Sequence, residues 1–318
     1  MSLDDDLRRM DDEEDMIFDL DSADDLDMGE SDVLMDTVDE LPLEVDFDDF
    51  NEDEDTVLPP PRMGDTENRV PGGLTGNGQI GMKLNVDVTV VLDVTGSMQD
   101  MIDSIKENVI NFRTLVYERL NDKLKMKRPD RTLDRMRVRV VAFRDYNFDW
   151  EAALQPQHGP MLQSEFFDLN DDADRVDLQT FVDQLEATGG EDDPESALEA
   201  IHFAVNSDWD TDSTSKHRHV IMVFTDAPAL SLEDERNATN IHYPSDPDMP
   251  RSLSELYAEY AGKMDPKAQR LLLFAPKDQY PCKEMEQWNG SSLIPVESDG
   301  GLAELAMEKI ISMLTGSL

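Results

Sequence analysis

The chain has 318 residues, of which 72 are acidic and 28 are basic, so its formal net charge at pH 7 is −44. This charge argues against binding to nucleic acid, which needs clustered Lys and Arg, and against binding to an anionic membrane surface. The single cysteine, Cys282, excludes a disulfide framework and disfavours a cysteine-based zinc site. We expect a cytoplasmic protein, because the sequence has neither a spanning apolar run nor the apolar core of a signal peptide.

Three regions follow one another along the chain. Residues 1–57 are predicted to be a disordered acidic tail. The first 55 residues hold 26 acidic and only two basic side chains, and repulsion between the acidic side chains opposes folding. Short apolar clusters lie between the acidic residues of this tail, which is typical of segments that fold onto a partner. The alternative is a tail that only keeps the protein soluble, which would have the same composition. Residues 58–83 form a Pro- and Gly-rich linker, and residues 84–318 form one globular domain.

The globular region alternates strands and helices. Six strands are expected, over residues 85–92, 138–143, 166–167, 220–224, 271–274 and 293–296. Helices are expected over residues 98–120, 176–187, 195–205, 253–264 and 302–314. This alternation predicts an α/β fold, in which a doubly wound, mostly parallel six-stranded sheet of Rossmann-like topology has helices on both faces.

Carboxylates follow two of the buried strands. Asp93 ends the run at residues 85–92, and Asp226 follows the run at residues 220–224. Ligands of such sheets bind at the carboxyl ends of the strands, so the two side chains should face one crevice. With the hydroxyls of Thr95 and Ser97 they offer oxygen ligands, which hard cations prefer.

Helix capping is the alternative interpretation of these hydroxyls. Ser97 and Asp100 have the spacing of a capping box. Capping requires neither Asp93 nor Asp226, however, so we favour a metal site. Magnesium is the expected ion, with manganese or calcium as alternatives, and the lack of imidazole and thiolate ligands argues against zinc.

These residues resemble the metal-ion-dependent adhesion site (MIDAS) of the von Willebrand factor A (VWA) domain family. The family motif Asp-x-Ser/Thr-x-Ser reads Asp93-Val94-Thr95-Gly96-Ser97 here, and Asp226 matches the Asp that follows the fourth family strand. The resemblance covers roughly residues 85–316. It implies a non-enzymatic, metal-dependent adaptor module, whose ion binds an Asp or Glu of a protein partner.

The second loop of the motif leaves two candidates. Many members of the family place Thr there, which would be Thr188. The segment at residues 192–196 (DDPES) resembles the loop of integrin β-subunit domains, which would make Glu195 the ligand and give Asp192 an adjacent ion. Residues 142–146 (AFRDY) together with residues 188–196 (TGGEDDPES) resemble A domains found beside atypical kinases. The alternative is that Glu195 only occupies the first helical turn, where the helix dipole favours an acidic residue. With Glu195 the ion would already carry three carboxylates, which would weaken its attraction for a partner carboxylate.

The partner class follows from the same resemblance. Such domains act within larger machines, including ATPase-linked and defence complexes. The acidic tail of the same chain could occupy the open metal position and so regulate the module. The alternative function is a metal-dependent hydrolase or phosphoryl-transfer enzyme that uses the same ion, with Asp192 or Asp193 as its base.

Other motifs are weaker. Residues 208–212 match the first positions of a calcium-binding loop. The sixth position of that loop should be Gly but is Ser213, and the twelfth should be Glu but is His219. The five histidines are scattered and none forms a His-Glu-x-x-His pair. The basic residues 216–219 are predicted to lie in a solvated loop before the strand at residues 220–224, and a weak contact with the acidic tail is the alternative role.

Overall fold

The computed structural model describes residues 82–127, 131–148, 158–190, 194–296 and 307–317. The predicted acidic tail, the linker up to residue 81 and Asp192 lie outside these ranges. Within them, no helix is long and apolar enough to cross a bilayer.

A seven-stranded sheet forms the centre of the domain, in the order β3-β2-β1-β5-β6-β7, with β4 paired to β2. Its strands are β1 (Met82–Asp93), β2 (Arg131–Phe143), β3 (Met161–Gln163), β4 (Phe167–Asp168), β5 (Lys216–Phe224), β6 (Gln269–Ala275) and β7 (Ser291–Pro295). All neighbouring pairs are parallel except those that β3 and β4 make with β2. The predicted mostly parallel α/β sheet is therefore confirmed.

The predicted number of six strands is wrong by one. The missing strand is β3, whose three residues are too few to show an alternating pattern. Strand β5 begins at Lys216, so the basic residues 216–219 lie in the sheet and the prediction of a solvated loop is wrong. These residues are polar, so hydrophobicity does not predict a strand here. Pairing with β1 and β6 holds this part of β5 in the sheet.

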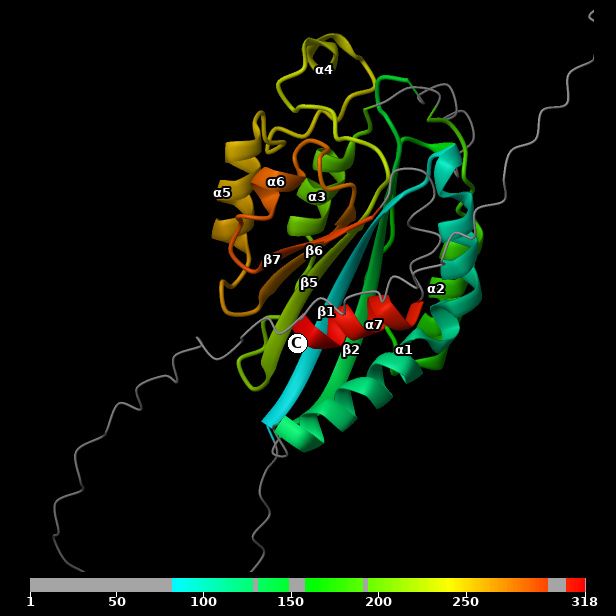
Figure 1. Ribbon diagram of the computed structural model, residues 1–318, viewed down its shortest axis with the longest axis vertical. Coiled ribbons are helices and arrows are strands. Elements are labelled where there is room, and N and C mark those ends of the chain that lie inside the picture. The colour runs from blue at the N-terminus through cyan, green and yellow to red at the C-terminus, as the bar shows by residue number, and fades with distance from the viewer. Residues whose placement is uncertain (1–81, 128–130, 149–157, 191–193, 297–306, 318) are drawn as a thin grey trace, which may run out of the picture. The chain divides into compact units, whose positions relative to one another are not determined.

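Helices cover both faces of the sheet, as Figure 1 shows. They are α1 (Gln99–Lys127), α2 (Asp172–Asp183), α3 (Ala197–Val205), α4 (Glu235–Thr239), α5 (Leu253–Lys263), α6 (Cys282–Met285) and α7 (Met307–Ser317), with a 3₁₀ turn, η2 (Gly96–Met98), before α1. Helix α2 begins earlier than predicted because the Asp171 side chain accepts hydrogen bonds from the backbone N–H groups of Ala173 and Asp174 and so caps it.

Two apolar layers hold the helices to the sheet. On one face, Val88 and Leu92 of β1 are buried in a cluster with residues of α1, α2 and α7. On the other face, Val91 of β1 belongs to a cluster with residues of α3 and α5. Successive residues of a strand point to opposite faces, so a strand buried on both faces is apolar almost throughout, which is the pattern of residues 88–92.

Strand β1 lies at the topological switch point of the sheet. The chain passes from β1 to β2 on one side, whereas β5 pairs with β1 on the other side and leads on to β6 and β7. Crossovers that run in opposite directions leave a crevice at the carboxyl ends of β1 and β5. Asp93 is the last residue of β1, and Asp226 follows the end of β5 by two residues. The carboxyl ends of these two strands lie at the upper end of the sheet in Figure 1.

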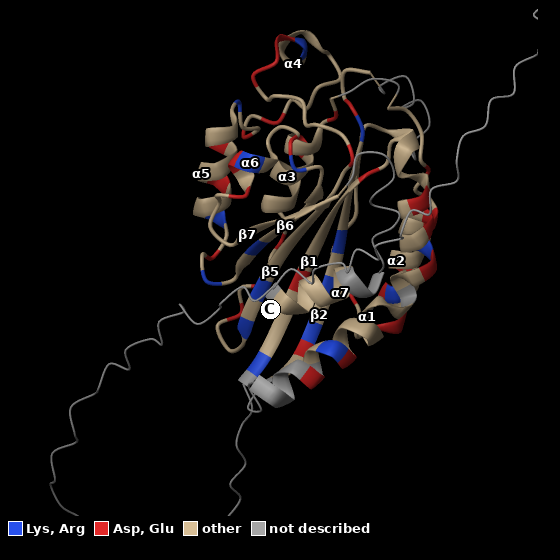
Figure 2. Cartoon of the chain, viewed as in Figure 1, with Lys and Arg blue, Asp and Glu red and all other residues tan. Residues whose placement is uncertain are grey.

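The lower end of the sheet, where the parallel strands begin, is polar. Figure 2 shows Lys and Arg along the lower half of the strands, whereas Asp and Glu are spread over α1. The buried carboxylate of Asp87 accepts two hydrogen bonds from Arg137, from Nε at 2.8 Å and from Nη2 at 2.6 Å. A bidentate pair of this kind satisfies both charges and allows them to lie inside the fold.

Candidate metal centre

Asp93, the last residue of β1, lies at the centre of the candidate site at the carboxyl ends of the strands and has no exposed surface. Its Oδ1 accepts hydrogen bonds from the Thr95 backbone N–H (3.0 Å) and the Thr95 hydroxyl (2.7 Å), and its Oδ2 accepts one from the Thr225 hydroxyl (2.8 Å). Burial raises the pKa of Asp93 to about 6, although these hydrogen bonds lower it. A buried carboxylate with this pKa is ionised at neutral pH and would be stabilised by a cation.

The oxygens of four side chains form a continuous row. Thr95 Oγ1 lies 2.7 Å from Asp93 Oδ1 and 3.3 Å from Ser97 Oγ, and Ser97 Oγ donates to Asp226 Oδ1 at 3.1 Å. Adjacent oxygens around Mg²⁺ are about 3 Å apart, because Mg–O bonds of about 2.1 Å meet at right angles. The observed spacings therefore fit neighbouring ligands of one hard cation.

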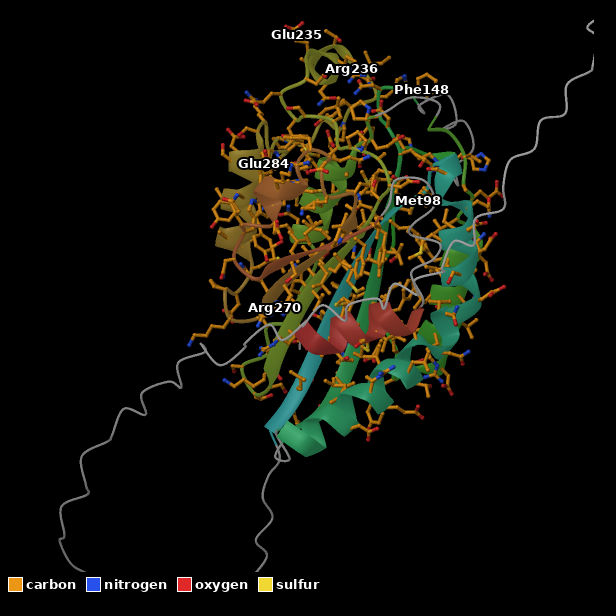
Figure 3. The ribbon with its side chains drawn as sticks, in the orientation of Figure 1. Met98, Phe148, Glu235, Arg236, Arg270 and Glu284 are labelled. Carbon is orange, nitrogen blue, oxygen red and sulfur yellow. The ribbon has the colours of Figure 1, made fainter. Side chains whose placement is uncertain are left out.

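Helix capping does not account for these hydroxyls. Thr95 is the N-cap of η2, but its side chain makes no capping hydrogen bond. Ser97 Oγ faces Thr95 Oγ1 and Asp226, so both hydroxyls are directed at the carboxylates. Met98, labelled in Figure 3, is the buried residue that follows Ser97 and anchors this turn at the start of α1.

The second loop is joined to the motif by its backbone. The N–H of Thr188 donates to Val94 O (3.1 Å), and the N–H of Gly96 donates to Gly189 O (3.2 Å). The buried Arg144 holds the same loop, since its guanidinium donates to the carbonyl oxygens of Thr188 and Glu186. Residues 186–189 are thereby held against the strand end that carries Asp93.

Gly190 has to be glycine for two reasons. Its φ is +73°, a conformation that other L-residues rarely adopt. A Cβ on Gly190 would also lie 2.6 Å from Thr95 Cβ and 3.4 Å from Glu195 Oε1. The bare Cα therefore lets the second loop approach the motif and brings the Glu195 carboxylate to the same place as Thr95.

Both second-loop candidates lie in this cluster. Thr188 Oγ1 is buried and has no hydrogen-bond partner in the described part of the chain. Glu195 is 1% exposed. Its backbone is paired with the loop that follows β5, since its N–H donates to Pro228 O (2.9 Å) and its carbonyl oxygen accepts from the Leu230 N–H (2.7 Å). The structure thus brings together Asp93, Thr95, Ser97, Thr188, Glu195 and Asp226, whereas Asp192 lies outside the described residues.

A second buried carboxylate lies one helical turn beyond Glu195. Glu199 is fully buried on α3 and accepts a hydrogen bond from the Tyr243 hydroxyl (2.7 Å). Burial raises its pKa to about 7, and the nearby charge of Asp145 adds to the effect. The upper end of the sheet therefore concentrates negative charge in a poorly solvated place.

The donor set suits a hard cation. In the described ranges no group of three or more His, Cys, Asp or Glu side chains is arranged to hold a metal ion, and the donors of this cluster include two hydroxyl oxygens. Carboxylate and hydroxyl oxygens could hold Mg²⁺, Mn²⁺ or Ca²⁺, and the row contains neither imidazole nor thiolate. The residues present therefore fit the expected ion.

Comparisons with known proteins give distant structural likenesses. The sequence matches no protein-family model, and a search of curated proteins found no match. The pilus adhesin SpaC from Lactobacillus rhamnosus GG is 12% identical, with a TM-score of 0.43 over 73% of this chain and 30% of the adhesin. The proximal thread matrix protein 1 of the mussel byssus, with a zinc-occupied MIDAS motif, is also 12% identical, with a TM-score of 0.38 over 73% of this chain and 48% of that protein. The chain thus spans less than half the length of either protein.

Proposed function

We propose that this chain is a non-enzymatic, metal-dependent protein interaction module of the VWA type. The observation that carries the proposal is the row of oxygens from Asp93 to Asp226, whose spacings of 2.7, 3.3 and 3.1 Å match the edges of one magnesium shell. The row lies at the switch point of the sheet, where ligands of doubly wound folds bind.

The ligands in this proposal are Asp93, Thr95, Ser97 and Asp226, with one oxygen from the second loop. The ion would supply positive charge at a surface that is otherwise acidic, and a carboxylate of the partner would complete its shell. Because hydroxyls and not further carboxylates supply the other ligands, the ion and its ligands carry no net negative charge that would repel a partner carboxylate. A protein partner with an exposed Asp or Glu therefore fits the site best.

Thr188 is our preferred second-loop ligand, because its buried Oγ1 lacks a hydrogen bond in the described part of the chain and a buried polar atom of this kind needs a partner. With Thr188 the ion has two carboxylate ligands and a formal charge of zero. With Glu195 it has three, and the net negative charge would repel a partner carboxylate. Thr188→Val should weaken magnesium binding about tenfold, and Glu195→Gln should weaken it less.

Magnesium titration by calorimetry tests the proposal. The full chain should bind one Mg²⁺ at this site, and Asp93→Ala should abolish binding. Asp100→Ala is the matched control, because Asp100 is an exposed aspartate in the first turn of α1 and should bind Mg²⁺ like the unchanged chain. Equal binding by Asp93→Ala and the unchanged chain would refute the site.

Partner capture separates the module from the alternative enzyme. An adaptor should capture its protein partner in Mg²⁺, and should lose it in EDTA or with Asp93→Ala. A metal-dependent hydrolase or phosphoryl-transfer enzyme should instead turn over generic phosphate esters, with activity that disappears in Asp93→Ala. Turnover of that kind would contradict the non-enzymatic proposal.

The acidic tail supplies a candidate for the bound carboxylate. We propose that one of the 26 acidic residues in positions 1–55 competes with the partner for the ion. Removing residues 1–60 should then raise the affinity for the partner in Mg²⁺, whereas the same truncation should not restore partner binding to Asp93→Ala. Unchanged affinity in Mg²⁺ would dismiss the idea.

A further inference from the structure

Four polar side chains share one face of three neighbouring strands at the lower end of the sheet. His217 and His219 of β5 are two positions apart, so they point to the same face. Asn85 of β1 pairs with His217, and Gln269 of β6 pairs with His219. In Figure 3, the labelled Arg270, which follows Gln269, marks this end of the sheet.

Both imidazoles donate their Nε2–H to backbone carbonyls. His219 Nε2 donates to Asp210 O at 2.8 Å, and His217 Nε2 donates to Asp212 O. A carbonyl oxygen only accepts hydrogen bonds, so in a neutral ring each Nδ1 carries a lone pair. Histidines that ligate metals are oriented in the same way, by a hydrogen bond from the ring nitrogen that does not bind the metal.

The two amides are oriented in the same way. Asn85 Nδ2 donates to Asp210 Oδ2 (3.1 Å), and Gln269 Nε2 donates to Asn289 O (3.2 Å). Reversing either amide would bring two acceptor oxygens together, so the partners fix which atom is the oxygen. Each amide therefore leaves its own oxygen for another interaction.

Four buried acceptor atoms result, and each has no hydrogen-bond partner in the described part of the chain: Asn85 Oδ1, His217 Nδ1, His219 Nδ1 and Gln269 Oε1. The nearby guanidiniums are engaged elsewhere, Arg137 with Asp87 and Asp208 O, and Arg139 with Ser164 O and Ser207 Oγ. Burying an acceptor without a partner is costly. A cation bound by the two imidazole nitrogens would satisfy the acceptors of His217 and His219.

The two rings are near enough to share an ion. Their centroids are 5.9 Å apart, and two imidazoles bound through nitrogen at about 2.1 Å from one metal have centroids about 5–6 Å apart. Trp209 stacks on His219 with a centroid distance of 5.1 Å and holds that ring in place. Burial lowers the pKa of His219, which favours the unprotonated ring that ligation requires.

We propose that His217 and His219 bind a borderline divalent transition metal through their Nδ1 atoms, with Zn²⁺ as the preferred ion. Imidazole nitrogen suits Zn²⁺, Ni²⁺ and Cu²⁺, whereas the oxygens around Asp93 suit Mg²⁺. Asp87, which pairs with His219, is six residues from Asp93, about 20 Å along β1. The site is therefore separate from the proposed magnesium site and does not depend on it.

Zinc titration of the full chain in excess Mg²⁺ tests the proposal, because Mg²⁺ occupies the upper site and competes poorly for imidazole. One Zn²⁺ per chain should bind. His219→Gln and His217→Gln should each weaken Zn²⁺ binding at least tenfold, whereas Asp93→Ala should bind Zn²⁺ like the unchanged chain. His242→Gln, which alters an exposed histidine outside the cluster, is the matched control and should have no effect.

X-ray absorption at the zinc edge provides a measurement on the unchanged chain, which does not depend on the folding of any variant. Two imidazole ligands should appear in the scattering of the bound zinc. A zinc shell without imidazole, the absence of bound zinc in excess Mg²⁺, or equal zinc affinity in the double variant His217→Gln/His219→Gln would each overturn the proposal.

Discussion

The two ends of the sheet differ in the chemistry that the same strands present. At the upper end, Asp93 and Asp226 bring charged oxygens into a crevice between loops, and burial raises the pKa of Asp93. At the lower end, His217 and His219 bring imidazole nitrogens onto the face of the sheet, beside the amides of Asn85 and Gln269. Parallel topology gathers side chains at both ends, so the ion proposed for each end follows from its residue types and not from the topology.

The largest effect should come from filling the space at Gly190. We expect Gly190→Ala to lower the free energy of unfolding by about 2–4 kcal/mol, because the new methyl meets Thr95 Cβ and the backbone keeps a positive φ. Magnesium affinity should fall with it, whereas zinc affinity at the lower end should not change. Chemical denaturation and the two metal titrations measure these effects.

Gly262→Ala is the control for that change. Gly262 lies in α5 with no atom within 4 Å of the added Cβ. Because alanine favours a helix over glycine, this variant should gain about 0.5–1 kcal/mol of stability. Equal destabilisation by both changes would contradict the close approach of the second loop to Thr95.

The buried carboxylate of Glu199 gives the next effect. Its folded pKa of about 7 exceeds its unfolded value of 4.5, so the folded state loses stability as pH rises through this interval. Glu199→Gln should therefore raise the free energy of unfolding at pH 8 by about 2 kcal/mol and change it little at pH 4. Thermal unfolding at both pH values tests this, with the exposed Glu284→Gln as the control.

Acid should weaken the upper site in a defined interval. The pKa of Asp93 is about 6, and a proton on this carboxyl competes with the metal. Between pH 7 and pH 5 the affinity for Mg²⁺ should fall about tenfold, with proton release on binding near pH 6. Calorimetry in buffers of different ionisation enthalpy measures both, and an affinity that stays constant over this range would contradict the assignment of Asp93.

Removing one hydroxyl should have the smallest effect. Thr225→Val loses the hydrogen bond to Asp93 Oδ2, which should raise the pKa of Asp93 further and weaken magnesium binding about fivefold at pH 6. Thr225→Ser keeps the donor and should behave like the unchanged chain. If serine and valine weaken binding equally, the hydroxyl has no part in the site.

The sequence predicts the parts of the fold that depend on periodicity. The apolar run at residues 88–92 and the long amphipathic helix α1 follow from it, and parallel topology predicts that Asp93 and Asp226 meet. Strand β3 and the start of β5 do not, because one is too short and the other is polar throughout.

The sequence also does not predict the contacts that join distant segments of the chain. Thr225, Arg144 and Gly190 show their roles only when the loops have met. The pairing of His217 with Asn85, and of His219 with Gln269, depends on strand register, which no motif in the chain specifies.

The backbone pairing of Val94 with Thr188 and of Gly96 with Gly189 joins the motif to the second loop. The amide hydrogen bonds of Gly96 and Thr188 should therefore open together, with one common protection factor against exchange with solvent deuterium. A cation held by both segments would slow both amides equally and would leave the amides of β6 and β7 as they were. Deuterium uptake at these two positions can thus report occupancy of the upper end before any partner is known.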